Sequence, residues 1–406
     1  MKAKRWKRVL FCFLIWSLLV GPAIGAEKKS DCVVCHEKVT ARIVQEYATS
    51  KMSASVDCQG CHGSAHNSTK NPELAQLPTP DLCGGCHETQ FKQYSDGKHA
   101  LAWVAMEAMP TTGFMPHPFI EGLKGCGGCH RIGLRPSKGE QAYRYGMPCI
   151  SCHTRHKFSS AEAQSPEACR MCHMGFDHPQ YEMWASSKHG AIFATDPASK
   201  RAPTCQTCHM EEGNHRVMTA WGFLALRLPE PDAEWMGYRT TILKGLQVLD
   251  PKGNPTPRLE VVKAGKVARL SMEEWQKERN RMLTTCLRCH STRFARLNLE
   301  NGDAMIKEAD RFMAQGINLV AGLYEEGIIQ PQPGKLAYPD MLTFYETMTP
   351  IEQRLYIMFM EHRMRTFQGA FHMNPDYVTW YGLAELKKDI VDMTREAQEM
   401  RAGKKK

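Results

Sequence analysis

Eight copies of the pattern Cys-x-x-Cys-His run through this chain of 406 residues. In this pattern the two cysteines form thioethers with the vinyl groups of a haem, and the adjacent histidine becomes an axial iron ligand. Zinc knuckles also use Cys-x-x-Cys pairs, but they do not require a histidine after every second cysteine. We therefore predict eight covalently bound haem c groups, attached through sixteen cysteines and eight histidines. The motifs are Cys32/Cys35/His36, Cys58/Cys61/His62, Cys83/Cys86/His87, Cys126/Cys129/His130, Cys149/Cys152/His153, Cys169/Cys172/His173, Cys205/Cys208/His209 and Cys286/Cys289/His290.

The remaining cysteine, Cys12, lies in an N-terminal segment with the pattern of a signal peptide. Residues 1–8 are basic, residues 9–20 are almost wholly apolar, and residues 23–26 (AIGA) offer small residues for cleavage after Gly25 or Ala26. This pattern predicts a signal peptide over residues 1–26, because the apolar run is short for a membrane span. An uncleaved N-terminal anchor is the alternative. Export to the periplasm or another extracytoplasmic space agrees with haem attachment, which takes place outside the cytoplasm.

The net charge argues against a nucleic-acid partner. The formal charge of the whole chain is +9, and residues 1–26 contain five basic and no acidic side chains, so removing five positive charges from +9 leaves +4. Each haem adds two propionates, which would make the loaded protein acidic. We therefore do not interpret the basic composition as nucleic-acid binding.

The sequence predicts a mainly α fold: a multihaem cytochrome c body with little regular sheet over residues 27–300, followed by long C-terminal helices over residues 301–406. Within the body, residues 181–189 are expected to form a short helix and residues 259–262 a short strand. Three helix boundaries carry local signals: Ser271 begins a helix with a capping box, Thr349-Pro350 begins another, and Asn374-Pro375 breaks that one. A further helix is expected to run to about Met400. Long helices against a haem body suggest an oligomer.

The number of histidines limits how many haems can have two protein ligands. A haem used only for electron transfer usually has two axial ligands from the protein, whereas a catalytic haem leaves one position open. Nine histidines lie outside the motifs, which is enough for seven closed haems and one open haem, but does not prove an open one. These nine are His66, His99, His117, His156, His178, His189, His215, His362 and His372.

Several segments together resemble the octahaem hydroxylamine oxidoreductases, over most of the chain after residue 26. They include Cys149–His156 (CISCHTRH), Ser187–Gly190 (SKHG), Pro203–Met210 (PTCQTCHM) and Arg288–Arg296 (RCHSTRFAR). The resemblance implies a mostly helical, haem-packed body with C-terminal helices, commonly a trimer.

The resemblance also implies roles for individual residues. The haem of the fourth motif, with His130, would be catalytic and open on its distal face. His215 would be the distal active-site histidine that exchanges protons with the bound nitrogen species, although Asn214 precedes it where some relatives have Asp. Tyr324 is a candidate for the active-site tyrosine, with a helix-packing role as the alternative. The distal iron ligands would be His66, His99, His156, His178, His189 and His372.

Two positions depart from the family pattern. The family has a Ser-x-His ligand between the first two motifs, but this chain has Ser50-Lys51-Met52, so Met52, His117 or His362 would complete the ligand set. A His/Met haem would have a raised potential. The oxidative enzymes have a tyrosine bonded to the catalytic haem of a neighbouring subunit, and here that register falls near Trp380. A missing cross-link is typical of the family's short branch, which is associated with nitrite reduction.

The predicted function is interconversion of hydroxylamine and nitrite or nitric oxide at one open haem, with seven haems for electron transfer. The reductive direction, toward ammonium, is slightly favoured. A cytochrome or quinone-linked protein would be the redox partner. The alternative is a non-catalytic conduit in which all eight haems have two protein ligands. The separate octahaem lineage with a lysine-ligated haem uses Cys-x-x-Cys-Lys, which this chain lacks.

Overall fold

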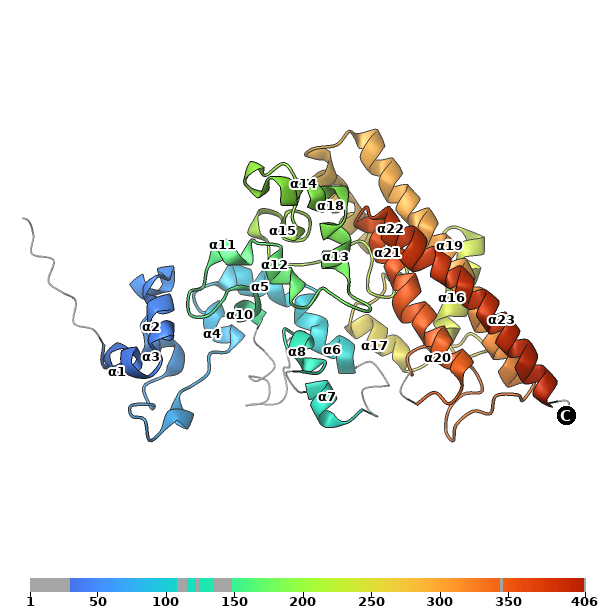
Figure 1. Ribbon diagram of the computed structural model, residues 1–406, viewed down its shortest axis with the longest axis horizontal. Coiled ribbons are helices and arrows are strands. Elements are labelled where there is room, and N and C mark those ends of the chain that lie inside the picture. Colours follow the sequence, from blue (N-terminus) through green and yellow to red (C-terminus); the bar gives the residue numbers. More distant parts are fainter. Residues whose placement is uncertain (1–29, 108–114, 122–123, 134–147, 344–345, 405–406) are drawn as a thin grey trace, which may run out of the picture.

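The computed structural model describes residues 30–107, 115–121, 124–133, 148–343 and 346–404. The predicted signal peptide, residues 1–26, lies outside these described residues. Figure 1 shows short helices along most of the chain and long helices gathered at the C-terminal end, with α1, α2 and α3 at the opposite end. The described residues contain two isolated β-bridges, Arg227 with Arg269 and Leu249 with Pro255, and no named strand. The predicted fold class, mainly α with little regular sheet, is therefore confirmed.

Whereas the eighth motif lies at the end of the longer helix α18 (Met272–Leu287), the first seven are carried by short helices. In order these elements are α1 (Asp31–Val39), α2 (Ala41–Ala48), η1 (Lys51–Ala54), α3 (Cys58–His62), η2 (Pro72–Leu74), α4 (Pro80–Gly84), α5 (Glu88–Ser95), η3 (His99–Leu101), α6 (Ala102–Glu107), α7 (His117–Glu121), α8 (Gly127–His130), α10 (Pro148–Cys152), α11 (Ser160–Ala163), α12 (Glu167–Arg170), α13 (Gln180–Ala185), α14 (Lys188–Thr195), η5 (Pro197–Ser199), α15 (Cys205–His209) and η6 (Glu211–Gly213).

Longer helices follow. They are α16 (Ala233–Gly245), α17 (Arg258–Ala264), α18 (Met272–Leu287), α19 (Thr292–Glu325), α20 (Pro350–Ile357), the π-helical η7 (Met358–Arg363), α21 (Met364–Phe371), α22 (Pro375–Val378), the π-helical η8 (Thr379–Ala384) and α23 (Glu385–Lys404). Helix α19 begins directly after the eighth motif and crosses residue 300, where we placed the domain boundary; that boundary stays a prediction. None of the helices within the described residues has the length and apolar character of a membrane span.

The predicted helix starts are formed by side-chain caps. Ser271 accepts a hydrogen bond from the Glu274 amide at 3.0 Å, and Thr349 accepts one from the Glu352 amide at 3.4 Å. Such caps satisfy amide groups that have no partner inside the helix. The short helix predicted at 181–189 is interrupted, because α13 ends at Ala185 and α14 begins at Lys188 after the N-cap Ser187.

The short strand predicted over residues 259–262 is wrong, because these residues form part of α17. Pro257 precedes the helix and Gly265 ends it, positions that favour a helix start and a helix end. An apolar run of this length fits either a strand or a buried helix, and the packing of Val262 in the core decides for the helix here.

The largest apolar core belongs to the C-terminal helices. Helix α19 packs against α16, α21 and α23, and its residues Met313, Ile317 and Val320 are fully buried. The core continues through α20 and α23, where Leu355 and Met393 are buried. This rigid helical block lies beside the motif-bearing body and supplies several of its contacts.

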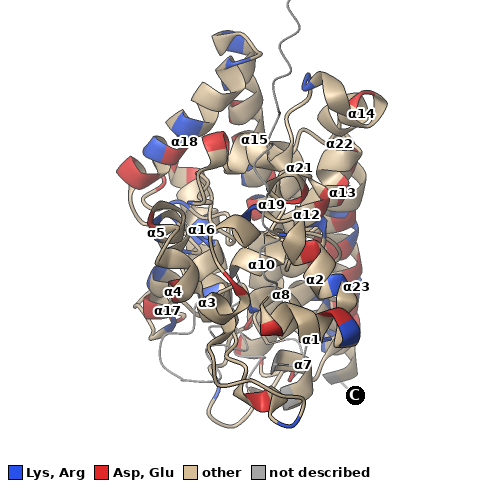
Figure 2. Cartoon of the chain, turned by 90° about the vertical axis from the view of Figure 1, so that its left-hand side faces the viewer, with Lys and Arg blue, Asp and Glu red and all other residues tan. Residues whose placement is uncertain are grey.

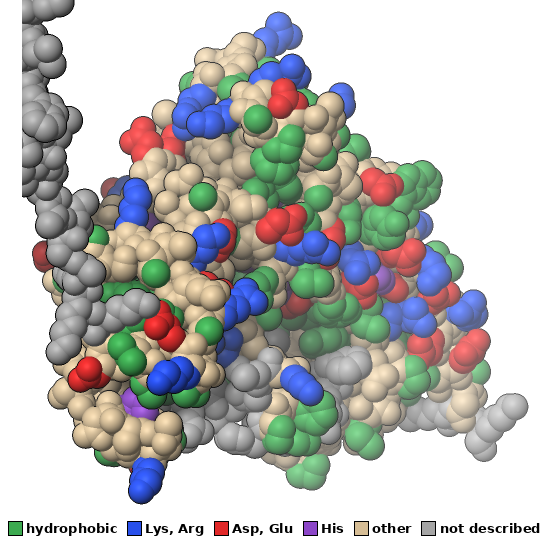
Figure 3. Space-filling view, turned by 60° about the vertical axis from the view of Figure 1, so that its left-hand side comes forward, with side chains coloured by type: hydrophobic (Ala, Val, Ile, Leu, Met, Phe, Trp, Pro, Cys, Tyr) green, Lys and Arg blue, Asp and Glu red, His purple; other side chains and the backbone are tan. Residues whose placement is uncertain are grey.

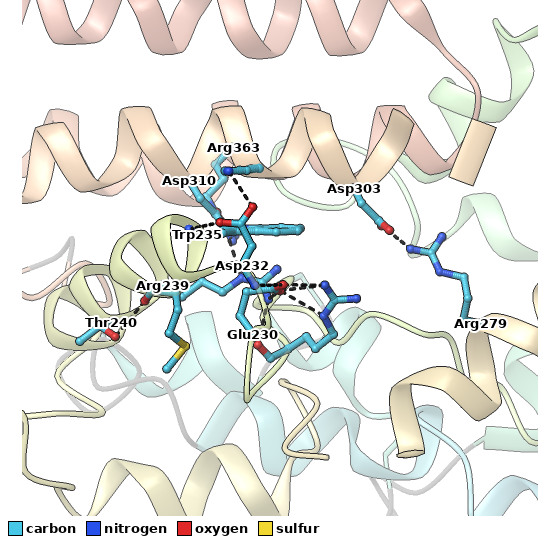
Figure 4. A network of polar contacts seen from close by, with 12 residues as sticks. Glu230, Asp232, Trp235, Arg239, Thr240, Arg279, Asp303, Asp310 and Arg363 are labelled. Carbon is cyan, nitrogen blue, oxygen red and sulfur yellow. Dashed lines mark hydrogen bonds and ion pairs between the residues drawn. The ribbon is translucent and has the colours of Figure 1, made fainter. Parts of the chain in front are cut away.

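A buried ion-pair network joins the helical block to the preceding loop (Figure 4). Glu230 bonds Arg227 at 2.8 Å and also contacts Arg239, while Asp310 of α19 bonds Arg363 at 2.7 Å. All of these side chains are almost fully buried. Because a buried charge is costly unless it is paired, the network fixes the position of this loop against α16 and α19.

Candidate haem-ligand pairs and redox site

Seven of the eight motif histidines face a second histidine ring across a constant gap. A metal–imidazole nitrogen distance is about 2 Å, so two rings on opposite sides of one metal ion have centroids roughly 6 Å apart. Every observed separation agrees with that value, and the residues therefore fit a haem iron held between them. The pairs and centroid separations are His36–His66, 6.0 Å; His62–His156, 6.0 Å; His173–His99, 6.1 Å; His130–His178, 6.2 Å; His153–His215, 6.2 Å; His290–His189, 6.1 Å; and His209–His372, 6.3 Å.

The ring orientations also suit metal ligation. His62 Nδ1 lies 2.8 Å from the Gln76 carbonyl oxygen, and His130 Nδ1 lies 2.9 Å from that of Ala102. A hydrogen bond at Nδ1 fixes the tautomer and leaves Nε2 free for a metal. The described residues contain no cluster of three or more His, Cys, Asp or Glu side chains that could hold a metal ion by itself, so the paired rings are the metal-binding feature they offer.

Burial keeps several of these rings neutral, which ligation requires. Burial lowers the pKa of His173 to about 4 and that of His209 to about 3. Burial also lowers the pKa of their facing partners, His99 and His372. Neutral imidazoles in an apolar setting are what an iron ion needs from its axial ligands.

All six residues predicted as distal ligands face a motif histidine. The structure thus brings His66, His99, His156, His178, His189 and His372 to positions that the resemblance implied; iron ligation itself stays a prediction. Several pairs join residues far apart in the sequence, such as His62 with His156 and His209 with His372.

The cysteines show which motifs are neighbours. Thiols of three pairs lie within hydrogen-bonding distance: Cys83 with Cys149, Cys129 with Cys172, and Cys169 with Cys205. Four further pairs lie close enough to interact electrostatically: Cys32–Cys58, Cys61–Cys83, Cys152–Cys169 and Cys208–Cys286. The contacts form a line through motifs 1, 2, 3, 5, 6, 7 and 8, and the fourth motif joins this line at the sixth.

Three of the sixteen cysteines predicted to attach haem lie in a different setting from the rest. Cys35, Cys86 and Cys289 are exposed, whereas the other thirteen motif cysteines are half-buried. The reason for Cys35 and Cys289 is that the first and eighth motifs end the line, so each has one neighbouring motif instead of two.

The exposure of Cys86 has a local reason. Cys86 lies in a run of exposed residues that also includes His87, while Cys83 of the same motif is covered by its contact with Cys149. The second thioether of the third motif would therefore lie at the surface. Haem attachment by Cys35, Cys86 and Cys289 stays a prediction.

The fourth motif has a distinctive environment. His178, which faces His130, has its Nδ1 2.8 Å from a carboxylate oxygen of Asp177. Burial alone would raise the pKa of Asp177, but the hydrogen bond and the charge of His178 lower it. His178 also lies 6.4 Å from the ring of His173, the axial histidine of the sixth motif. An ionised carboxylate held against this imidazole strengthens it as a proton carrier.

A phenylalanine and a tyrosine also lie beside the Asp177–His178 pair. Phe223 stacks on His178 with centroids 5.4 Å apart. Tyr356 of α20 lies near Asp177 and Cys126, and burial, with the charges of both, raises its pKa to about 12. We did not predict Asp177, Phe223 or Tyr356 as site residues. The signal for Asp177 was present, since an acid directly precedes a histidine at 177–178.

The structure differs from the prediction in the residue that faces His130. His215, expected there, instead stacks opposite His153, and its backbone N–H donates to Gln93 at 3.0 Å. The reason is that residues 213–216 follow the seventh motif, while His178 follows the sixth, which adjoins the fourth. The catalytic roles assigned to His130 and His215 stay predictions.

Tyr324 lies in the helical block. Its hydroxyl donates to Glu352 at 2.6 Å, and its ring packs against the C-terminal core. Within the described residues no contact between Tyr324 and a motif histidine is found. This contact agrees with the alternative role of Tyr324 in helix packing. A catalytic role for Tyr324 stays a prediction.

The three candidates for the missing ligand lie in different surroundings. Met52 is half-buried on η1. His117 begins α7, and its side chain lies outside what the structure describes. His362 is buried in η7 with its Nδ1 2.5 Å from Asp389. The pairing of His362 with a carboxylate in the C-terminal block separates it from the motif-bearing body.

Charge and apolar surface support a haem-filled body. Figure 2 shows basic and acidic residues interspersed along helices such as α23. Figure 3 shows apolar side chains in patches among the charged ones on one face. Exposed apolar residues beside motifs include Val34, Leu82, Met171 and Leu287, which suit contact with a macrocycle.

The chain resembles several known proteins. A family model described as "Seven times multi-haem cytochrome CxxCH" matches residues 28–226 and 258–336. A "Probable nitrite reductase-hydroxylamine oxidoreductase fusion protein" from Kuenenia stuttgartiensis is 26% identical over 474 aligned positions, covering 92% of this chain and 52% of that protein. The chain thus spans about half the length of that curated relative.

Solved structures share the fold. One is a chain of the "Kuenenia stuttgartiensis reducing HAO-like protein complex Kustc0457/Kustc0458", with a TM-score of 0.70, 23% identity, and coverage of 91% of this chain and 85% of that one. A "Hypothetical multiheme protein" has a TM-score of 0.68, 21% identity, and coverage of 92% and 96%.

Proposed function

Because the chain belongs to the family of multi-haem CxxCH cytochromes and is similar to hydroxylamine oxidoreductases, as its sequence predicted, we propose that it is an octahaem oxidoreductase acting on hydroxylamine and nitrite. The reaction takes place at the haem of the fourth motif. The observation that carries this proposal is the Asp177–His178 pair that faces His130. Among the Nδ1 contacts described for the seven pairs, this is the one to a carboxylate.

When bound, the fourth haem supplies the iron that takes the nitrogen atom and the electrons that reduce it. Conversion of nitrite toward ammonium consumes protons as well as electrons, and the reverse chemistry releases them. His178 is placed to hand over these protons, because the contact of its Nδ1 with Asp177 fixes its tautomer and its orientation.

Phe223 and Tyr356 shape the same space. The ring of Phe223 covers one face of His178 and holds it against sideways rotation. Tyr356, whose raised pKa keeps it protonated, is a second group able to donate a hydrogen bond. We therefore prefer Tyr356 to Tyr324 as the active-site tyrosine.

The remaining motifs connect this site to the surface. The contact of Cys129 with Cys172 and that of His178 with His173 place the sixth motif between the fourth and the rest. Electrons would pass through that junction to either arm of the line. A soluble cytochrome or a quinone-linked protein is the redox partner we propose, and a homo-oligomer, such as a trimer, the assembly.

The test is a steady-state assay of the holoprotein with nitrite and a chemical reductant, and with hydroxylamine and an electron acceptor. Activity in wild type and its loss in His178→Gln support the proposal. Equal activity in the two proteins would refute it. A reduced-state absorption spectrum then addresses direction: a red-shifted band indicates a tyrosine-linked haem and oxidation of hydroxylamine, whereas its absence agrees with reduction.

Trp380 and Tyr381, near the register of that cross-link, lie exposed on η8, and Tyr381 packs near Tyr377 with ring centroids 5.1 Å apart. Within the described residues neither tyrosine contacts a motif of its own chain. We keep the slight preference for the reductive direction.

One observation favours the conduit as a second candidate. The His130–His178 separation of 6.2 Å matches that of the other pairs, which fits two axial ligands on every haem concerned. A conduit would not bind nitrite, cyanide or hydroxylamine at the fourth haem without unfolding. Binding of any of these to the folded wild-type protein at that haem would exclude it.

For localisation we propose export through residues 1–26. N-terminal sequencing of the mature protein from its native host is the test. A chain that begins at residue 26 or 27 is expected, and a chain that begins at Met1 would show an uncleaved anchor instead.

A further inference from the structure

The third motif differs from the other seven in the surroundings of its histidine. In the part of the chain that the structure describes, no histidine ring faces His87, whereas a ring about 6 Å away faces each of the other seven. We propose that His87 is the only histidine ligand of the third haem, and that the sixth position of this iron takes a small exogenous ligand.

Eight of the nine histidines outside the motifs have a partner other than His87 in the described residues. Seven of the nine histidines outside the motifs each face one motif histidine, and none of these seven faces His87. His362 is buried on η7 and bonded to Asp389 in the C-terminal block. The one histidine left is His117, whose side chain lies outside what the structure describes, so a control substitution tests it directly.

The sequence departure at Met52 agrees with this count of histidines. Position 52, where the resemblance implies a histidine ligand, carries Met52. The seven pairs seen in the described residues involve no residue at position 52. We therefore assign the ligand that position 52 lacks to the third haem.

The third motif lies between other motifs, so a ligand at its haem would affect electron transfer between them. Cys83 lies within hydrogen-bonding distance of Cys149, and Cys61 lies near Cys83, so the third motif stands between the second and the fifth. Burial lowers the pKa of His153 and of His215, and the charge of nearby His87 lowers both further, which places His87 beside the fifth pair. His87 is also an exposed side chain.

The ligand class follows from the iron. A small molecule with a nitrogen, carbon or oxygen lone pair, such as nitrite, hydroxylamine or cyanide, would bind there. A bound ligand would change the potential of a haem that joins motifs 1 and 2 to the rest of the line. The site would thus control electron flow separately from chemistry at the fourth motif.

The test counts high-spin haems per chain in the oxidised holoprotein by magnetic circular dichroism, using the His178→Gln variant. In this variant the fourth haem is open whether or not His178 is a ligand in wild type. We expect two high-spin haems per chain, from the third and fourth motifs, and conversion of both to low spin by cyanide. One high-spin haem would overturn the proposal.

Wild type provides a second readout that needs no substitution. If the third and fourth haems are both open, wild type has two high-spin haems. If the third is open but His178 ligates the fourth, wild type has one. The wild-type count therefore tests the proposed function at the fourth haem separately from the proposal for the third. No high-spin haem in wild type would overturn the proposal even if the variant did not fold.

Two control substitutions examine the remaining side chains. His117→Gln and Met52→Leu, each combined with His178→Gln, should leave the count at two. A rise from one to two in either combination would identify that residue as the sixth ligand of the third haem and overturn the proposal.

Discussion

Replacing Asp177 by Asn should slow the reaction at the fourth motif by about ten- to thirty-fold. The change keeps the shape of the side chain but removes the charge that His178 contacts at 2.8 Å. A hydrogen bond to a charged group contributes about 1.5–3 kcal/mol. The two side chains are 29% and 27% exposed, so solvent screening favours the lower part of this range, about 1.5–2 kcal/mol. Because about 1.4 kcal/mol corresponds to a factor of ten in rate, the expected loss follows.

The assay is kcat/KM for nitrite with a chemical reductant, measured over a range of pH. A positioning role predicts a fall in kcat with a smaller change in KM, and a changed pH profile, since the carboxylate that orients His178 and itself titrates is lost. Asp376→Asn is the matched control, because Asp376 is an exposed carboxylate in the first turn of α22. If Asp177→Asn stayed within twofold of wild type at every pH while the haem content was unchanged, the pair would not be the proton relay.

Three further substitutions probe the scaffold. Tyr324→Phe should leave kcat/KM unchanged and lower the free energy of unfolding by about 1 kcal/mol, through loss of the hydrogen bond to Glu352; a large loss of activity with intact folding would restore the catalytic role. Glu230→Gln leaves Arg239 buried with less compensation and should destabilise the fold by about 3–5 kcal/mol, seen as a lower Tm, whereas a neutral result would contradict the network's role. Burial alone would raise the pKa of Glu278, but its arginine partners lower it. Its contribution to stability is therefore present above the usual carboxyl pKa and is lost as pH falls through the depressed value, so the Tm difference between wild type and Glu278→Gln should shrink on acidification; a pH-independent difference would argue against this linkage.

The motifs and the long helices could be predicted from the sequence because their signals are local. A Cys-x-x-Cys-His run fixes its own chemistry, and Thr349 with Pro350 fixes a helix start within one turn. The candidate distal ligands were also recognisable, because a haem-rich chain has few other uses for so many histidines. These predictions depend on residue type and short spacing alone.

The pairing of the histidines could not be predicted in the same way. His62 meets His156 and His209 meets His372 only after the short helices pack, so sequence distance gives no guide to the partner. The same limitation misplaced the distal histidine of the fourth motif: His215 stands ten residues after Cys205, yet the fold carries it to His153. The Asp before His178 was the better signal, since a carboxylate beside an imidazole has a direct chemical consequence.

The proposed function requires that the fourth haem reacts with substrate and that His178 serves it without binding the iron. A crystal structure of the oxidised holoprotein soaked with nitrite tests this most directly. We predict nitrite on the iron opposite His130, with His178 Nε2 within hydrogen-bonding reach of the ligand and well beyond the metal–nitrogen bond length of about 2 Å. A direct bond from His178 to that iron, with no nitrite, would contradict this mechanism and establish the fourth haem as part of a conduit.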